Sequence, residues 1–181
     1  MPKKKRNTLK KLIASSERYK FEFSPLKDTH VRLFYAAYKR GTFDRMQLDD
    51  DLTPLEFIKV LEDLSVGSKL YVYTDSTGNP MVLIILSLGR VTEVHAYFTE
   101  WASDRQRLMI GVLFFGGLGK TRKVITQSSN PFLDYFKRIS SYGILRKVGD
   151  IEDAYPDEDN PTGTVFQARN VNTKLLTPLE V

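Results

Sequence analysis

The sequence predicts an α/β (α+β) protein in which about four helices flank a mixed, mainly antiparallel central sheet. Two observations carry this prediction. Segments whose apolar residues alternate or run together, as in strands, are interspersed with segments of helical periodicity. Helix-start signals precede the helical segments, and glycine-containing turns follow several of them. The resulting order is strand, two helices, three strands, helix, strand, helix, strand, loop and strand.

The first predicted elements are a half-buried strand and a helix. Residues 19–24 alternate aromatic and polar side chains, which is typical of a strand with one buried face. Asp28 can cap a helix over residues 28–40, and Gly41 provides its stop signal. An acidic loop, Asp49 to Asp51, follows this helix.

A second helix is predicted directly after this loop. Thr53 and Glu56 have the spacing of a capping box, in which each side chain bonds the other residue's backbone amide. Pro54 takes the first helical position, where its missing N–H is not needed. The apolar stripe of this helix consists of Leu55, Ile58, Leu61 and Leu64.

The periodicity then changes to that of three consecutive strands, over residues 70–73, 81–88 and 91–98. The segment 81–88 is almost unbroken in its apolar character, which indicates burial on both faces of the sheet. Because residues 75–80 and Gly89 form turns between these segments, the sequence predicts an antiparallel meander.

Helices and strands alternate in the second half of the chain. Ser103 and Gln106 form another capping box, and the helix from there to Leu118 is apolar nearly all round, as a core helix would be. Asn130 caps a further helix that has Pro131 at its first position. The remaining predictions are strands over residues 123–127, 142–148 and 164–168, and an exposed acidic loop over residues 150–159.

Length and composition indicate one globular domain. The chain has 181 residues, and a domain has about 150. We expect a basic N-terminal tail over residues 1–18, a single domain over 19–169 and a C-terminal tail over 170–181. The chain has no cysteine, which excludes a disulfide scaffold, a cysteine-ligated metal and a cysteine nucleophile. With two histidines, we expect no metal site.

Charge is concentrated at the N-terminus. The chain carries a net charge of +5, the first twenty residues carry +7, and the rest therefore carries −2. Such a terminus can contact phosphate, anionic lipid or an acidic protein surface, or it can be a solvated, flexible tail. The basic residues concerned are Lys3, Lys4, Lys5, Arg6, Lys10, Lys11, Arg18 and Lys20.

Targeting signals give an expectation about location. The basic start is not followed by the apolar stretch of a secretory signal. The longest run without a polar side chain, residues 108–118, is shorter than the roughly 20 residues of a membrane span. We therefore expect a protein of the cytoplasm or of a virion, neither secreted nor membrane-spanning.

Residues 19–169 resemble the GNAT (N-acetyltransferase) superfamily in the order of their elements. The most specific local match is 123–149, where a strand leads into Asn130, an aromatic-rich helix follows, and Gly143 opens the next strand. Residues 52–56, which precede the meander, are similar to those of short GNAT-like proteins of tailed bacteriophages. One branch of those proteins is packaged as an internal virion protein. The resemblance implies a fold built around acetyl-CoA.

The GNAT signature, Q/R-x-x-G-x-G/A, is degenerate in this chain. The glycines of that signature let backbone N–H groups approach the pyrophosphate of coenzyme A at a helix N-terminus. Starting the match at Arg107 puts Gly111 one residue late, and Leu113 stands where the next small residue belongs. Glu100 and Asp104 add negative charge where a phosphate would bind. The candidate cofactor-binding residues are Arg105, Arg107, Gly111 and Asn130.

Catalytic candidates follow from the same resemblance. The family often has a tyrosine acid seven residues after the asparagine, but Lys137 stands there, and Tyr142 is a substitute only if the helix is shifted. The base candidates are Glu93 and His95, which share one face of the strand with Tyr97. The alternative is that the tyrosine belongs to the core and that this strand face is solvated.

The sequence leaves three functions open. The first is a GNAT-like, virion-associated or assembly protein that has lost or weakened catalysis and binds a protein partner, without a cofactor. The second is an acetyl-CoA-dependent N-acyltransferase that acts on an amine. The third is DNA or RNA binding through the basic N-terminal arm, which would not read sequence. The acidic segments 49–51 and 150–159 lack the ligand spacing of a calcium loop, so we interpret them as exposed loops.

Overall fold

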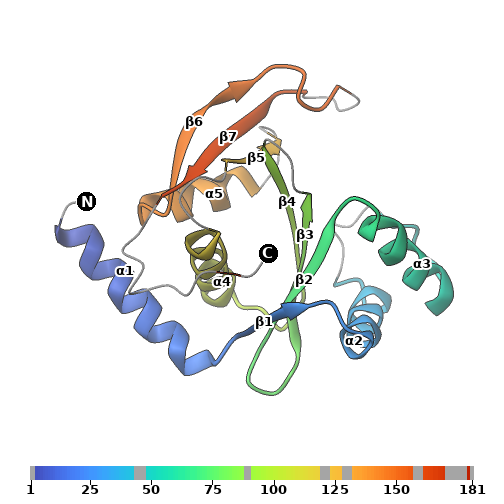
Figure 1. Ribbon diagram of the computed structural model, residues 1–181. Helices are drawn as coiled ribbons and strands as arrows, with labels where there is room; N and C mark the ends of the chain where they lie inside the picture. Colours follow the sequence, from blue (N-terminus) through green and yellow to red (C-terminus); the bar gives the residue numbers. More distant parts are fainter. Residues whose placement is uncertain are drawn as a thin grey trace. The chain divides into compact units, whose positions relative to one another are not determined.

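The structure is a computed structural model that describes residues 3–42, 48–87, 91–118, 123–127, 132–156, 161–169 and 179 (Figure 1). Its helices are α1 (Lys3–Ser16), α2 (Asp28–Lys39), α3 (Pro54–Ser65), α4 (Asp104–Gly117) and α5 (Phe132–Ser141), with a short 3-10 turn at Glu17–Tyr19. Its strands are β1 (Glu22–Pro25), β2 (Lys69–Thr74), β3 (Pro80–Ser87), β4 (Thr92–Phe98), β5 (Lys123–Gln127), β6 (Leu145–Ile151) and β7 (Gly163–Ala168).

The strands form one sheet in the order β1-β2-β3-β4-β5-β7-β6. The β1–β2, β2–β3, β5–β7 and β6–β7 pairs are antiparallel, whereas β4 and β5 are parallel. The predicted fold class, a mixed and mainly antiparallel sheet with helices, is therefore confirmed. None of the described helices has the length and apolar character that a membrane-spanning helix needs.

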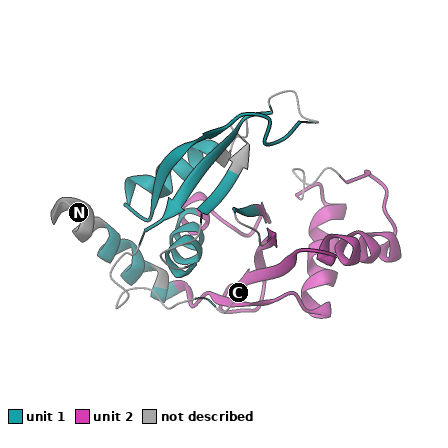
Figure 2. Cartoon of the chain, turned by 45° about the horizontal axis from the view of Figure 1, so that its top comes forward, with its two compact units in different colours: residues 1–18, 89–94, 108–181 teal, residues 19–88, 95–107 magenta. Residues whose placement is uncertain are grey.

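The chain divides into two compact units, which Figure 2 draws in different colours. Unit 1 consists of residues 1–18, 89–94 and 108–181, and unit 2 of residues 19–88 and 95–107. Unit 2 contains α2, α3, β1, β2, β3 and the end of β4. Unit 1 contains α1, most of α4, α5 and the strands β5, β6 and β7, together with the beginning of β4.

The core of unit 2 lies between its two helices and its sheet. Phe34 of α2 and Phe57 of α3 are fully buried, and both pack in one cluster with Leu83 of β3. The capping box that the sequence predicts is present: the Thr53 amide donates to Glu56 Oε2 at 2.8 Å, and the Glu56 amide donates to Thr53 Oγ1 at 3.4 Å. This box fixes where α3 begins and so which of its faces meets the sheet.

The apolar stripe predicted for α3 is only partly correct. Leu61 is buried, but Leu55 is 78% exposed and Ile58 is 40% exposed. The residue that fills the core in their place is Phe57, which the predicted stripe left out. Its ring packs 5.4 Å from that of Tyr38, and this aromatic packing on α2 sets the rotation of α3.

Unit 1 is held together by aromatic packing between α4, α5 and the sheet. The ring of Phe136 on α5 lies 5.0 Å from that of Phe115 on α4 and 5.2 Å from that of Phe166 on β7. Ile139 of α5 and Val124 of β5 are fully buried. The end of α4 is also bound by the chain's C-terminal part, because the Leu179 amide donates to the Gly117 carbonyl at 3.1 Å.

Two elements differ from those predicted. The basic N-terminal segment contains a helix, α1, whose Leu9 is fully buried and whose Ile13 is 8% exposed. Strand β6 begins at Leu145 rather than 142, because Gly143 turns the chain with a φ of +78°. It continues into the predicted acidic loop, where Thr164 Oγ1 of β7 donates to the carboxylate of Asp150.

Candidate functional site

The turn between β4 and α4, residues 99–103 of unit 2, is where a GNAT protein would hold coenzyme A. Thr99 anchors the turn to β3: its amide donates to the Met81 carbonyl at 3.1 Å, and its hydroxyl donates to the Pro80 carbonyl at 2.8 Å. Thr99 is fully buried. The chain therefore leaves the sheet at a fixed position.

Several backbone amides around the start of α4 donate within the chain. The predicted capping box is present, with the Ser103 amide donating to Gln106 Oε1 at 3.0 Å and the Gln106 amide donating to Ser103 Oγ at 3.4 Å. The Ala102 amide donates to the Thr99 carbonyl, and the Arg107 amide donates to the Ser103 carbonyl. Together with Thr99, five amides of this segment have a partner in the protein itself.

The acid of the turn, Glu100, is paired with Arg40 at the end of α2. Arg40 donates from Nε and Nη2 to Glu100 Oε1 at 2.9 and 2.6 Å. The guanidinium also lies 5.4 Å from the ring centre of Trp101. Burial raises the pKa of Glu100, but hydrogen bonds from Thr42, its own amide and Arg40 outweigh it, so this pKa lies below its usual range. Glu100 is therefore ionised at neutral pH, with the Arg40 guanidinium as its counter-charge.

The two arginines of the predicted site have different surroundings. Arg105 is exposed on the first turn of α4. Arg107 is half-buried, donates from Nε to the Ala102 carbonyl at 2.9 Å and lies 5.4 Å from the ring centre of Phe98. Part of the hydrogen-bonding capacity of Arg107 is thus used to close the turn on itself.

Gly111 lies in the middle of α4, in unit 1, beneath α5. A Cβ atom at this position would stand 2.6 Å from Ile139 Cδ1 and closer still to the Tyr135 hydroxyl. The absence of a side chain is therefore required for α5 to pack on α4. The fourth cofactor candidate, Asn130, lies outside the described residues.

These observations test the turn against coenzyme A, the cofactor that the fold implies. A pyrophosphate at this place needs unengaged N–H groups and positive potential. Here the amides named above are bonded to the chain, and Glu100 and Asp104 bring negative charge. The described turn does not fit the family's phosphate cradle.

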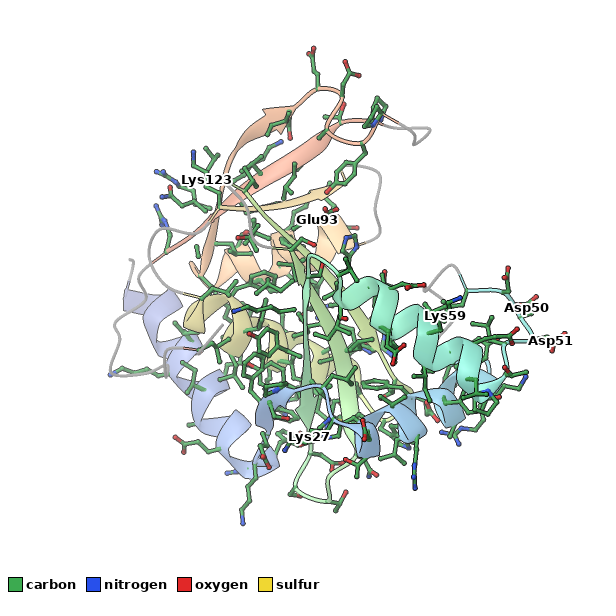
Figure 3. All side chains as sticks on the ribbon, turned by 45° about the vertical axis from the view of Figure 1, so that its right-hand side comes forward. Lys27, Asp50, Asp51, Lys59, Glu93 and Lys123 are labelled. Atoms are coloured by element: carbon green, nitrogen blue, oxygen red, sulfur yellow. The ribbon has the colours of Figure 1, made fainter. Side chains whose placement is uncertain are left out.

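Glu93, the first base candidate, belongs to unit 1 and has a partner that the sequence analysis missed. Figure 3 labels Glu93 on β4. The hydroxyl of Tyr155 donates to its carboxylate, and the Tyr155 amide donates to the Pro161 carbonyl at 2.9 Å. Burial, followed by the nearby charge of Glu93, raises the pKa of Tyr155. Tyr155 is the one aromatic residue in the acidic segment 150–159, and this is the sequence signal that could have identified it.

His95 and Tyr142 lie in different surroundings. His95 is exposed on β4, in unit 2, and its ring stacks parallel to that of Tyr97 with centroids 6.4 Å apart. Tyr142 is half-buried in the turn after α5, in unit 1, where its amide donates to the Ile139 carbonyl at 3.0 Å. The catalytic roles of Glu93, His95 and Tyr142 stay predictions.

The acidic segment before α3 is held by tyrosines of α2. The hydroxyl of Tyr38 accepts from the Leu52 amide at 2.8 Å and donates to the Asp49 carbonyl, and the hydroxyl of Tyr35 donates to the Leu52 carbonyl at 3.1 Å. Over the described ranges, no group of three His, Asp or Glu side chains is placed to hold a metal ion.

No protein-family model and no curated protein sequence matches this chain. Its structure is similar to those of solved N-acetyltransferases. A spermidine N-acetyltransferase chimera from Vibrio cholerae and hSSAT superposes with a TM-score of 0.55 at 12% identity, over 86% of this chain and 97% of that chain. The spermidine N-acetyltransferase of Vibrio cholerae, solved with CoA and spermine, gives 0.56 at 8% identity, over 82% and 95%. At such identities the similarity establishes the fold, and this chain has the fold of the GNAT N-acetyltransferases.

Proposed function

We propose that this protein uses the GNAT fold as a protein-binding module within a larger assembly, and not as a coenzyme A-dependent enzyme of the standard kind. One observation carries the proposal: five amides of residues 99–107 donate within the chain, among them those of the Ser103–Gln106 capping box and the Thr99 anchor. In the GNAT fold this turn is where the cofactor's phosphates are held, so a closed turn removes the principal source of cofactor affinity.

Charge supports the same conclusion. A pyrophosphate would approach Glu100, whose pKa is held low by its hydrogen bonds, and Asp104 in the first turn of α4. Arg40 is already engaged by Glu100 and Trp101, and Arg107 donates to the Ala102 carbonyl. Opening this network for a phosphate would break several bonds that the folded chain already makes.

An assembly role in a phage particle is the specific form of this proposal. The resemblance to short GNAT-like proteins of tailed bacteriophages supports it, since one branch of those proteins is packaged inside the virion. The exposed Lys10 and Lys11 of α1 add a basic surface that could contact packaged DNA or an acidic neighbour. In this form the protein acts in the virion or in the host cytoplasm.

N-acyltransferase activity toward an amine is the second candidate. The observation that favours it is the fold itself, which this chain shares with an acetyltransferase whose structure holds CoA and spermine. Glu93 supplies a carboxylate on β4, with Tyr155 bonded to it. For this function to hold, acetyl-CoA would have to bind without the family's phosphate cradle.

Calorimetry with acetyl-CoA on the full chain separates the two functions, at low and at physiological salt. We expect no heat of binding at millimolar acetyl-CoA for the natural protein. The Ser103→Ala/Gln106→Ala variant opens the capping box, and weak binding by this variant alone would show that the closed turn excludes the cofactor. Micromolar binding by the natural protein at both salts would overturn the proposal and lead to a screen of amine acceptors.

A further inference from the structure

A hollow of about 290 Å³ lies in unit 2 between the first turn of α2 and residues 58–65 of α3. Its apolar lining includes Val31 of α2, Ile58 and Leu61 of α3, and Leu70 of β2. Three charged residues, Lys27, Asp28 and Glu62, also line it. An apolar floor with a few charged groups around it is the composition of a binding pocket, and this volume suits one large apolar side chain or a small ligand.

The helix beside this hollow exposes apolar side chains to solvent. Leu55 is 78% exposed, Ile58 is 40% exposed and Val66, directly after α3, is 82% exposed. Their spacing of three and eight residues brings them to one side of the helix, together with Glu62. These are three of the five large hydrophobic residues that are exposed in the described part of the chain. An apolar stripe next to an apolar hollow marks an interaction surface.

Charges around the stripe are mainly acidic. Asp28 and Glu62 line the hollow, and Asp63 is exposed on the next position of α3. Asp49 and Asp50 are exposed in the segment before α3, which Tyr35 and Tyr38 hold in place. Figure 3 labels Asp50 in this segment, together with Lys27 and Lys59. The basic residues of α2 and α3 also include Arg32 and Lys39, and Lys39 lies 3.8 Å from Asp51. A partner that complements this surface carries positive charge beside an apolar anchor.

We propose that this α2–α3 surface, defined by Lys27, Asp28, Val31, Ile58, Glu62 and Val66, binds a basic amphipathic helix of another protein. An apolar side chain of that helix would fill the hollow, neighbouring ones would cover Ile58 and Val66, and lysines or arginines would face Asp28 and Glu62. This inference rests on the proposed function, since it assigns the surface through which the module binds its partner.

A second copy of this chain is a less suitable occupant of the α2–α3 surface than a different protein. The chain has a basic amphipathic helix of its own, α1, in which Lys10 and Lys11 are exposed. However, Leu9 is fully buried and Ile13 is 8% exposed, so the apolar face that would enter the hollow is already covered in unit 1. Helix α1 of a second copy is therefore excluded, and we assign the surface to a helix of a different protein.

The experiment uses synthetic peptides on the full chain, because the partner is defined by its chemistry. The probes are a leucine–lysine peptide of about 18 residues with helical spacing, the matching leucine–glutamate peptide and a scrambled leucine–lysine peptide. We expect the helical leucine–lysine peptide alone to bind, with an affinity that falls as salt is raised. Fluorescence anisotropy of labelled peptides measures each affinity.

Two variants locate the binding. Ile58→Asp and Glu62→Lys should each weaken the leucine–lysine peptide by about tenfold or more, since each changes an anchor or a facing charge. Ile151→Asp is the matched control, because Ile151 is 42% exposed in unit 1, close to the 40% of Ile58. Unchanged circular dichroism for all three variants ensures that altered affinity is not altered folding.

Several outcomes would overturn the inference. They are equal binding of the acidic or scrambled peptide, no binding of any peptide, and an affinity that Ile58→Asp leaves unchanged. Sedimentation that shows a dimer of the natural chain, dissociated by Ile58→Asp, would assign the surface to a second copy instead.

If the leucine–lysine peptide fails to bind and acetyl-CoA also fails to bind, the assignment of the α2–α3 surface is wrong while the proposed function stands. If acetyl-CoA binds at micromolar concentration, the proposed function itself is wrong.

Discussion

At the scale of single residues, Gly111 shows how a signature residue can have a structural purpose. In the GNAT signature a glycine allows a phosphate to approach the backbone. In this chain the space above Gly111 is taken by Ile139 and Tyr135 of α5, which leave no room for a Cβ atom. The glycine is therefore explained by helix–helix packing alone.

Gly111→Ala should destabilise the protein by up to about 2 kcal/mol. The overlap of the new methyl group with Ile139 and Tyr135 costs about 1–3 kcal/mol, and the higher helix propensity of alanine offsets roughly 1 kcal/mol of it. Denaturant unfolding measures the difference. Gly149→Ala is the control, since a Cβ there has no atom within 4 Å, and its stability should stay close to that of the natural chain. Equal stability of the Gly111→Ala protein would show that α5 is not packed as described.

At the scale of elements, local signals in the sequence correctly predict the starts of two helices, whereas the predicted Asp28 cap is wrong because Lys27 is the N-cap of α2. The capping boxes at Thr53–Glu56 and Ser103–Gln106 are confirmed, because the groups that make them lie three residues apart. Helix α1 has no such signal. Its first turn contains no acid that would interact favourably with the positive end of the helix dipole. Burial of Leu9 stabilises this helix.

The capping box of α3 should make stability depend on pH. Hydrogen bonds from the amide and hydroxyl of Thr53 lower the pKa of Glu56 below its usual range in the folded protein. The ionised form therefore stabilises the fold above the usual carboxyl pKa, and this stabilisation is lost as pH falls through the lowered value. Unfolding at several pH values should show that Glu56→Gln is less stable than the natural chain near neutrality. The difference should shrink between about pH 5 and pH 3. A difference that is constant with pH would contradict this assignment.

At the scale of the whole molecule, net charge differs between the two units. Counting Lys and Arg against Asp and Glu, unit 1 carries +7 and unit 2 carries −2, which together give the +5 of the chain. The sequence indicated this asymmetry, but assigned the positive charge to a tail. In the structure, the described part of this basic segment is a helix, α1, that has a buried apolar face.

Binding to a polyanion should therefore depend on α1. Lys10→Glu/Lys11→Glu should elute from heparin at a clearly lower salt concentration than the natural chain, because both side chains are exposed and each reversal replaces attraction by repulsion. Lys27→Glu/Lys59→Glu makes the same change of charge in unit 2 and should shift elution much less. The same shift from both variants would show that overall charge, and not α1, determines the interaction.

The candidate site also shows what the sequence could not provide. The position of the β4–α4 turn and its acidic character follow from the spacing of residues 99–111. The contacts that decide its chemistry join distant positions: Arg40 binds Glu100 across 60 residues, and Tyr155 binds Glu93 from the turn after β6. Such pairs arise from tertiary packing, which local periodicity does not encode.

The position of Trp101 gives the molecule an optical reporter. It is the single tryptophan of the chain, it lies in the β4–α4 turn, and its indole is next to the guanidinium of Arg40. Intrinsic tryptophan emission therefore comes from this turn alone. Any ligand that loosens the contact between Arg40 and Trp101 changes the intensity or wavelength of that emission, so occupancy of the turn can be followed in unlabelled protein.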